Sequence, residues 1–131
     1  MSQENVEIVR RLVPVKERRP DEYEPYLHPE VEIIPAPNFP DSEVFHGHAG
    51  FERWKTRWPS TFERHDIEPT RFWDAGNQVV VELHERALWA GGSIPVERHF
   101  AHIWTFREGA VISIQIFNDP AEALEATGLS E

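Results

Sequence analysis

The stretch NQVVVELHERALWAGGSIPVERHFAHIWTFREGAVISIQIFND, residues 77–119, decides the fold. Three of its segments, residues 78–89, 94–107 and 111–117, are rich in the Val, Ile, Thr, Phe and Trp that favour β-strands. The connections Ala90-Gly91-Gly92-Ser93 and Glu108-Gly109 are short and contain glycine, as hairpin turns do. The stretch therefore predicts three consecutive antiparallel strands.

The two glycine turns also predict which side chains share a face, because directly opposed residues of neighbouring strands point the same way. With both turns closing hairpins, His102 lies opposite Val81 on one side and Gln115 on the other. A slip of one residue at the first turn would turn the first strand over. In the predicted register one face is aromatic with a few polar groups; it carries Val79, Val81, Leu83, Glu85, Phe100, His102, Trp104, Phe106, Val111, Ser113, Gln115 and Phe117.

The opposite face of these strands is polar at the first hairpin and rich in isoleucine beyond it, with Ile103, Ile112, Ile114 and Ile116. An exposed apolar patch of that size would be an aggregation liability on a monomer. We therefore expect the aromatic face to meet helices and the isoleucine face to meet a second copy of the chain in a homodimer.

The rest of the chain supplies elements that can cover this sheet. The expected elements are a helix near the N-terminus, a short helix at 20–27, a strand at 31–34, an irregular loop at 35–48, a helix at 49–62, an edge strand at 65–73 and a short C-terminal helix. The helix at 49–62 would carry Phe51, Trp54, Trp58 and Phe62 as one aromatic stripe. Asp119 would be the N-cap of the last helix.

Composition limits the possible partners. With 131 residues, 40% hydrophobic and 27% charged, the chain predicts one globular domain spanning residues 1–131. The formal net charge of −10 argues against nucleic acid and anionic membranes, because both need a basic surface. No apolar run approaches a membrane span or a signal core, and no cysteine is present, so a cytoplasmic protein is expected.

Five short stretches, in this order, resemble the SnoaL-like family of the nuclear transport factor 2-like superfamily. They are HPEVE at 28–32, HGHAGF at 46–51, DAGNQVV at 74–80, WTFREG at 104–109 and DPAEALEATGL at 119–129. The resemblance covers nearly the whole chain. It implies an α+β cone-shaped barrel, in which a curved, mostly antiparallel sheet wraps around three helices from the N-terminal half. It also implies a pocket between the concave face and the helices, but not a particular chemistry.

The residues expected to line that pocket are mostly aromatic. They are Phe39, His46, Phe51, Trp54, Trp58, Phe62, Phe100, Trp104, Gln115 and Phe117. Each one alone is more often a core residue than a ligand contact, but the set favours an apolar, largely aromatic ligand.

Three residues are candidates for acid–base chemistry. His102 lies between Phe100 and Trp104 on the aromatic face, with Glu85 on the same face, and histidine exchanges protons near neutral pH. A buried histidine bonded to Gln115 or to the backbone is an equally good interpretation. Asp119 matches the position of a carboxylate that ends the last strand in SnoaL-like cyclases, although its N-cap position already explains it.

No cofactor or metal motif is present: there is no glycine-rich phosphate loop, HExxH motif or Ser-His-Asp order. Two functions therefore stay open. One is a cofactor-independent isomerase, cyclase or dehydratase acting on an apolar cyclic molecule, with His102 as the main acid or base. The other is a non-catalytic ligand-binding or dimeric scaffold protein of the same fold.

Overall fold

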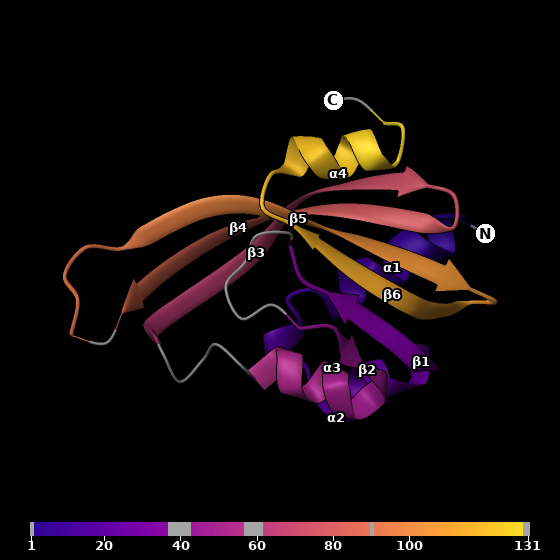
Figure 1. Cartoon of the computed structure of the whole chain (residues 1–131), viewed down its shortest axis with the longest axis horizontal. Helices are drawn as coiled ribbons and strands as arrows, with labels where there is room; N and C mark the ends of the chain where they lie inside the picture. Colours follow the sequence, from indigo (N-terminus) through magenta and orange to yellow (C-terminus); the bar gives the residue numbers. More distant parts are fainter. Residues whose placement is uncertain (1, 37–42, 57–61, 90, 130–131) are drawn as a thin grey trace.

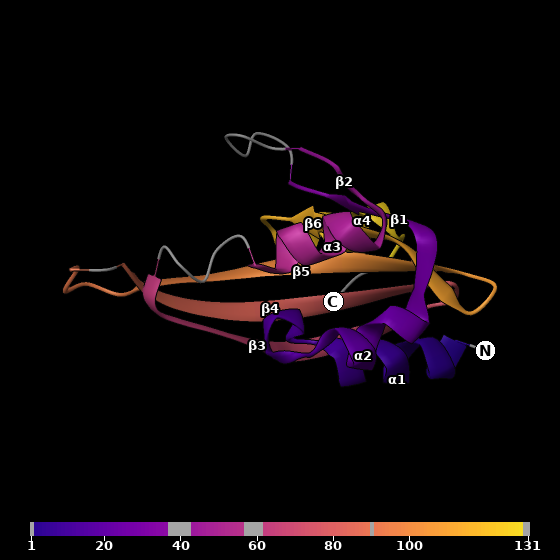
Figure 2. The same ribbon diagram turned by 90° about the horizontal axis from the view of Figure 1, so that it is seen from below.

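A six-stranded curved sheet with helices on both faces forms the molecule (Figures 1 and 2). The computed structural model describes residues 2–36, 43–56, 62–89 and 91–129. The strands are β1 (Leu27–Ile34), β2 (Phe45–His46), β3 (Phe62–Ala75), β4 (Gln78–Trp89), β5 (Val96–Arg107) and β6 (Ala110–Phe117). The helices are α1 (Ser2–Leu12), α2 (Pro20–Tyr23), α3 (Gly47–Thr56) and α4 (Pro120–Ala126), with short 3₁₀ helices η1 (Val15–Glu17) and η2 (Glu24–Tyr26).

The strand order is β2-β1-β6-β5-β4-β3, and every neighbouring pair is antiparallel except β1 and β6. On the inner face, residues of α1, α2 and α3 pack with Val81, Leu83 and Trp104 and form the main buried core. On the outer face, α4 packs Ala123 and Leu124 against the sheet. The predicted α+β architecture, a curved and mostly antiparallel sheet covered by helices, is confirmed.

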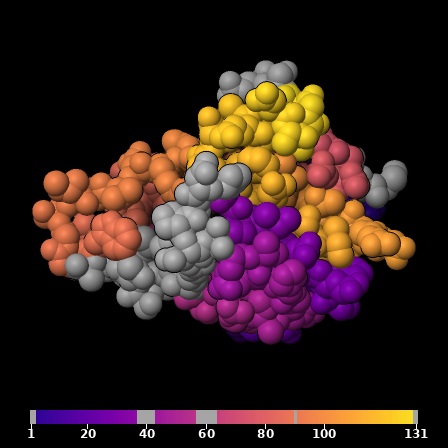
Figure 3. All heavy atoms as spheres, viewed as in Figure 1, coloured from indigo at the N-terminus to yellow at the C-terminus, as the bar shows by residue number. Residues whose placement is uncertain are grey.

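Both predicted hairpins form. Between β4 and β5, Val81 pairs with His102 and His84 pairs with His99, as the glycine turn predicts. Glu108 and Gly109 have φ values of 52° and 83°, so both residues of the second turn are left-handed, as a two-residue type I′ hairpin requires. Figure 3 shows the β4–β5 hairpin, in orange, projecting from the body of the molecule.

The register of β6 differs from the prediction beyond this turn. Phe106 still pairs with Val111, but Thr105 pairs with Ser113, so Ile112 is an extra residue that makes a β-bulge. The bulge turns the rest of the strand over. His102 therefore pairs with Ile116 instead of Gln115. Ile114 and Ile116 point inward, whereas Gln115 and Phe117 share the outer face with Ile103 and Ala101.

This bulge also removes the isoleucine patch on which the expected homodimer rested. Ile114 is fully buried in the main core, and Ile103 is buried among the residues that α4 covers. The prediction of one continuous isoleucine surface is therefore wrong. The homodimer itself stays a prediction.

The aromatic helix is shorter than predicted. α3 ends at Thr56, so Phe51 and Trp54 lie on it, while the backbone of Phe62 already belongs to β3. Phe39 and Trp58 lie outside the described residues, as does the side chain of Phe62. Within the described part of the chain, no helix is long and apolar enough to cross a membrane.

Candidate functional site

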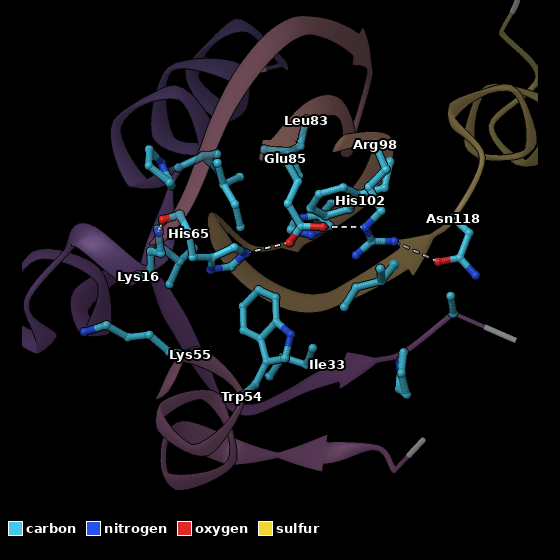
Figure 4. A pocket seen from close by; sticks show the side chains of 18 of the residues that line it. Lys16, Ile33, Trp54, Lys55, His65, Leu83, Glu85, Arg98, His102 and Asn118 are labelled. Atoms are coloured by element: carbon cyan, nitrogen blue, oxygen red, sulfur yellow. Dashed lines mark hydrogen bonds and ion pairs between the residues drawn. The ribbon is translucent and has the colours of Figure 1, made fainter. Parts of the chain in front are cut away.

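A cavity of about 120 Å³ lies between the inner face of the sheet, α3 and η1 (Figure 4). Its apolar lining includes Val13, Val15, Ile33, Phe45, Trp54, Ile67, Leu83, Phe100 and Ile116. Its polar lining consists of Lys16, Lys55, His65, Glu85, Arg98, His102 and Asn118. An apolar cavity with a few polar groups is the usual form of a small-molecule site.

The alternation of β4 and β5 brings the central polar groups together. Leu83 and Glu85 are two residues apart on β4, and Arg98, Phe100 and His102 follow the same period on β5. Glu85 pairs directly with Arg98 across the two strands, so their side chains share the inner face.

His102 lies in the most apolar part of the site. Its side chain packs between Phe100 and Trp104, with ring centroids 5.5 and 6.5 Å away, and Trp54 of α3 faces it at 5.7 Å. The indole Nε1 of Trp104 donates a hydrogen bond of 3.4 Å to Nδ1 of His102. Because an indole N–H can only donate, Nδ1 is the acceptor and a neutral His102 carries its proton on Nε2.

Burial also keeps His102 neutral. The apolar surroundings, and to a lesser extent the positive charge of Arg98, lower the pKa of His102 to about 3. At neutral pH the ring is therefore an uncharged hydrogen-bond donor through Nε2, and it does not readily accept a proton.

Glu85 is the centre of a second polar group, which we call the carboxylate network: His65, Glu85, Arg98 and Asn118. Nε2 of His65 lies 2.6 Å from one carboxylate oxygen of Glu85, and Nε of Arg98 donates to the other oxygen at 2.5 Å. Nη1 of Arg98 also donates to Asn118 Oδ1 at 3.3 Å. Figure 4 shows this chain running along one wall of the cavity.

The network keeps Glu85 ionised. Burial acts to raise the pKa of the Glu85 carboxyl, but hydrogen bonds from His65 and Arg98, together with their charges, hold it below its ordinary value. The cavity thus contains an uncharged histidine and a charged carboxylate. Two titratable groups held in different protonation states can take different roles in acid–base chemistry.

Two lysines lie on the other side of the cavity. The Lys16 ammonium donates to the backbone carbonyl of His65, and the Lys55 ammonium donates to that of Arg18. Lys55 also bonds at 3.3 Å to the Tyr23 hydroxyl, which in turn donates to Glu52. Within the described part of the chain, neither ammonium lies within 4.0 Å of a carboxylate.

Of the residues expected in the pocket, the structure brings together His102, Glu85, Trp54 and Phe100. Phe51 and Trp104 are fully buried in the core behind the lining. Gln115 and Phe117 lie on the outer face because of the bulge, so their predicted place in the pocket is wrong.

His46 and Asp119 also lie away from the cavity. The His46 side chain is 68% exposed, and its Nδ1 lies 3.3 Å from a carboxylate oxygen of Glu32. The Asp119 carboxylate accepts a hydrogen bond of 2.9 Å from the Ala121 backbone N–H, so it caps α4 as the sequence predicts. It is not part of the cavity lining.

Sequence reasoning missed His65, Arg98, Asn118 and the two lysines. A signal existed for two of them. Arg98 continues the period of Phe100 and His102 and faces Glu85, and His65 alternates with Ile67 between charged residues. The positions of Lys16 and Lys55 depend on how η1 and α3 pack, which no local pattern predicts. Within the described residues, no group of three His, Asp or Glu side chains is arranged to hold a metal ion.

A curved sheet closed by helices over a cavity defines the class of the protein, an α+β fold with an internal pocket. The model of the SnoaL-like domain matches residues 9–114, and the chain belongs to this family. A search of curated proteins gives no match.

Solved structures show the same fold. TerC, co-crystallised with polyporic acid, is 21% identical, with a TM-score of 0.72 over 95% of this chain and 98% of TerC. A putative SnoaL-like polyketide cyclase from Jannaschia sp. CCS1 is 18% identical, with a TM-score of 0.74 over 99% and 95% of the two chains. A protein of ketosteroid isomerase-like fold from Catenulispora acidiphila DSM 44928, in complex with trimethylamine, is 18% identical, with a TM-score of 0.71 over 95% and 94%.

Proposed function

We propose that this chain binds a small, mostly apolar, ring-sized molecule in the cavity. The observation that carries the proposal is the cavity itself, with its apolar walls and its few convergent polar groups. Its volume of about 120 Å³ is close to that of an engineered apolar cavity of roughly 150 Å³ that takes up benzene. TerC was co-crystallised with polyporic acid and the Catenulispora acidiphila protein forms a complex with trimethylamine, and both support small-molecule binding. A cytoplasmic location stays a prediction from the sequence.

Cofactor-independent proton transfer is the chemistry that the lining favours. A ketone in the cavity would accept a hydrogen bond on its oxygen from Nε2–H of His102. The Glu85 carboxylate would take a proton from the carbon beside the carbonyl, and the electron pair of the broken C–H bond would form the enolate. In a ketone with a double bond between its β and γ carbons, the enolate is conjugated, and return of that proton to the γ carbon would give the α,β-unsaturated isomer. His102 thus acts here as a hydrogen-bond donor to the ketone oxygen, whereas the sequence predicted it as the main acid or base without deciding between the two.

One observation favours the alternative function, which is binding without catalysis. Both oxygens of Glu85 already accept hydrogen bonds, from His65 and Arg98. A carboxylate held in this way is a weaker base than a free one. The two readings therefore need separate experiments.

Binding is tested by filling the cavity. Cyclohexanone and phenol at about 100 times Kd should stabilise the wild type by about 2.7 kcal/mol, a rise in Tm of about 10 °C. Ile116→Trp places an indole in the cavity and should abolish the shift. The matched control Ile112→Trp lies on the same strand outside the lining and should retain it. No shift in the wild type, or an equal shift in Ile116→Trp, would contradict binding at this site.

Catalysis is tested by exchange of the hydrogens beside the carbonyl of cyclohexanone in D₂O, followed by NMR. The wild type should accelerate exchange, and Glu85→Gln should slow it by about a hundredfold. Glu68→Gln, an exposed glutamate on β3, is the control and should leave the rate unchanged. If cyclohexanone binds but the wild type does not accelerate its exchange, the protein is a binding protein for this class of molecule.

A further inference from the structure

The charges around the cavity have the opposite sign to those of the whole chain. The chain carries a formal net charge of −10. The cavity lining nevertheless contains three cations, Lys16, Lys55 and Arg98, and one carboxylate, Glu85. These four groups together have a formal charge of +2, that is three minus one. A cavity of this sign favours an anion over a neutral molecule of the same shape.

Arg98 is the cation best placed to contact a ligand. Its guanidinium is fixed by Glu85 at 2.5 Å and by Asn118 at 3.3 Å, and it lies 4.5 Å above the centre of the Phe100 ring. Its side chain is 39% exposed. The planar fork is thus held rigid while part of it stays accessible at the edge of the cavity.

The remaining donors of this guanidinium have no partner among the described residues. Nε bonds to Glu85 and Nη1 to Asn118, and neither of these bonds involves Nη2. Figure 4 shows the guanidinium at the cavity wall, with its third nitrogen turned toward the space above Trp54. A planar carboxylate matches the geometry of such a fork.

The two lysines differ from Arg98 in their position. Their ammonium groups are bound to backbone carbonyls on the opposite side of the cavity (Figure 4). They contribute positive potential without a rigid, planar contact, and Glu52 lies near Lys55 through the Tyr23 hydroxyl. The specific contact to an anion is therefore assigned to Arg98.

We propose that the ligand of this cavity carries a carboxylate, and that Arg98 binds it while the ring lies against Trp54 and Phe100. This inference rests on the proposed function, since it concerns the same cavity. It adds the chemical class of the ligand, a small cyclic acid, and makes Arg98 the residue that selects for it.

The test compares benzoate with benzamide, which have the same shape but differ in charge, by calorimetry at pH 7. A charge-assisted hydrogen bond contributes about 1.5 kcal/mol or more, so benzoate should bind about tenfold tighter than benzamide to the wild type. Arg98→Gln should abolish this preference, and Arg98→Lys should retain only part of it, because an ammonium lacks the planar fork. Arg86→Gln, which removes an exposed arginine paired with Glu97, should change neither affinity.

A double variant separates contact from net charge. Arg98→Gln combined with Glu85→Gln removes one positive and one negative group, so the lining keeps its formal charge of +2 while the guanidinium is lost. Loss of the benzoate preference in this variant supports the contact with Arg98. A preference that persists in it overturns the assignment.

The outcomes also separate this inference from the function on which it rests. If both probes bind the wild type equally, or benzamide binds more tightly, small-molecule binding stands and the proposal that the ligand carries a carboxylate is wrong. If neither benzoate, benzamide nor cyclohexanone binds, both proposals are wrong. The comparison of the two probes on the wild type needs no variant to fold.

Discussion

At the scale of single residues, two neighbouring histidines on the inner face show how surroundings decide chemistry. His102 has apolar rings on three sides and an indole N–H on Nδ1, so it is neutral. His65 lies 2.6 Å from an ionised carboxylate, Glu85. The same type of side chain is thus enclosed by apolar rings in one position and hydrogen-bonded to a charged carboxylate in the other.

The first prediction concerns the pH dependence of stability. The pKa of His102 is about 3 in the folded chain and 6.5 when unperturbed. Between these values the unfolded chain binds a proton that the folded chain excludes. The free energy of unfolding should therefore fall as pH decreases from 6.5 toward 3, by up to about 1.4 kcal/mol per pH unit from this group.

Urea unfolding at several pH values measures this slope. Other acidic groups and histidines titrate in the same range, so the quantity to compare is the difference between the wild type and His102→Gln. The amide can still accept the hydrogen bond from Trp104 but does not titrate. Equal slopes for the two proteins would show that His102 is not a buried neutral imidazole.

The second prediction concerns the tautomer of His102. The bond from Trp104 to Nδ1 favours the form with the proton on Nε2. Nitrogen chemical shifts of the imidazole should report this tautomer in the wild type, and Trp104→Phe should remove the preference. Trp73→Phe on the outer face is the control, and should leave the shifts unchanged. A wild-type ring protonated on Nδ1 would contradict the donor role given to Nε2.

At the scale of elements, the bulge at Ile112 decides which half of β6 meets the cavity. A sequence with uniform alternation predicts Gln115 opposite His102, but the extra residue places Ile116 there instead. The residue beside the imidazole is therefore the apolar Ile116 and not the predicted amide of Gln115. The alternation of Ile112, Ile114 and Ile116 is uninterrupted in the sequence, so no local signal marks the bulge. The strand itself was predictable, whereas its register after the bulge depends on packing against β1 and β5.

The third prediction concerns the end of the same strand. Asp119 caps α4, and an N-cap contributes about 1 kcal/mol to stability. Asp119→Ala should lower the free energy of unfolding by about that amount, with no change in ligand binding or in exchange of cyclohexanone. Asp119→Asn is the control, since it keeps the cap and should restore stability. Loss of exchange activity in both variants would show that the carboxylate takes part in chemistry after all.

At the scale of the whole molecule, the site is assembled from segments that are distant in sequence. Lys16, His65 and Arg98 come from η1, β3 and β5. The hairpin turns predicted the part of the site on β4 and β5, because alternation and turn geometry are local. β3 contains a register shift between Pro69 and Arg71, and η1 follows an irregular connection after α1. The positions of the side chains on β3 and η1 therefore depend on tertiary packing. In the sequence, only the family resemblance pointed to a pocket there.

The last prediction is the homodimer through the outer face of the sheet. Ile103 lies under α4 and Ile114 and Ile116 point inward, so any contact must use the partly polar surface left beside α4, which includes Ser113, Gln115 and Thr105. Each copy also carries a net charge of −10, which opposes association. Because salt screens this repulsion, the dimer should be weak at low ionic strength and strengthen as NaCl is added. Sedimentation velocity over micromolar concentrations measures this dependence.

Two variants test the contact surface. Gln115→Glu adds a negative charge to this surface in both copies and should weaken the dimer. Glu68→Asp, a substitution on β3 that keeps the charge, is the control and should weaken it less. A chain that sediments as a monomer at high micromolar concentration in physiological salt would end this prediction, and with it the scaffold function that needs a dimer.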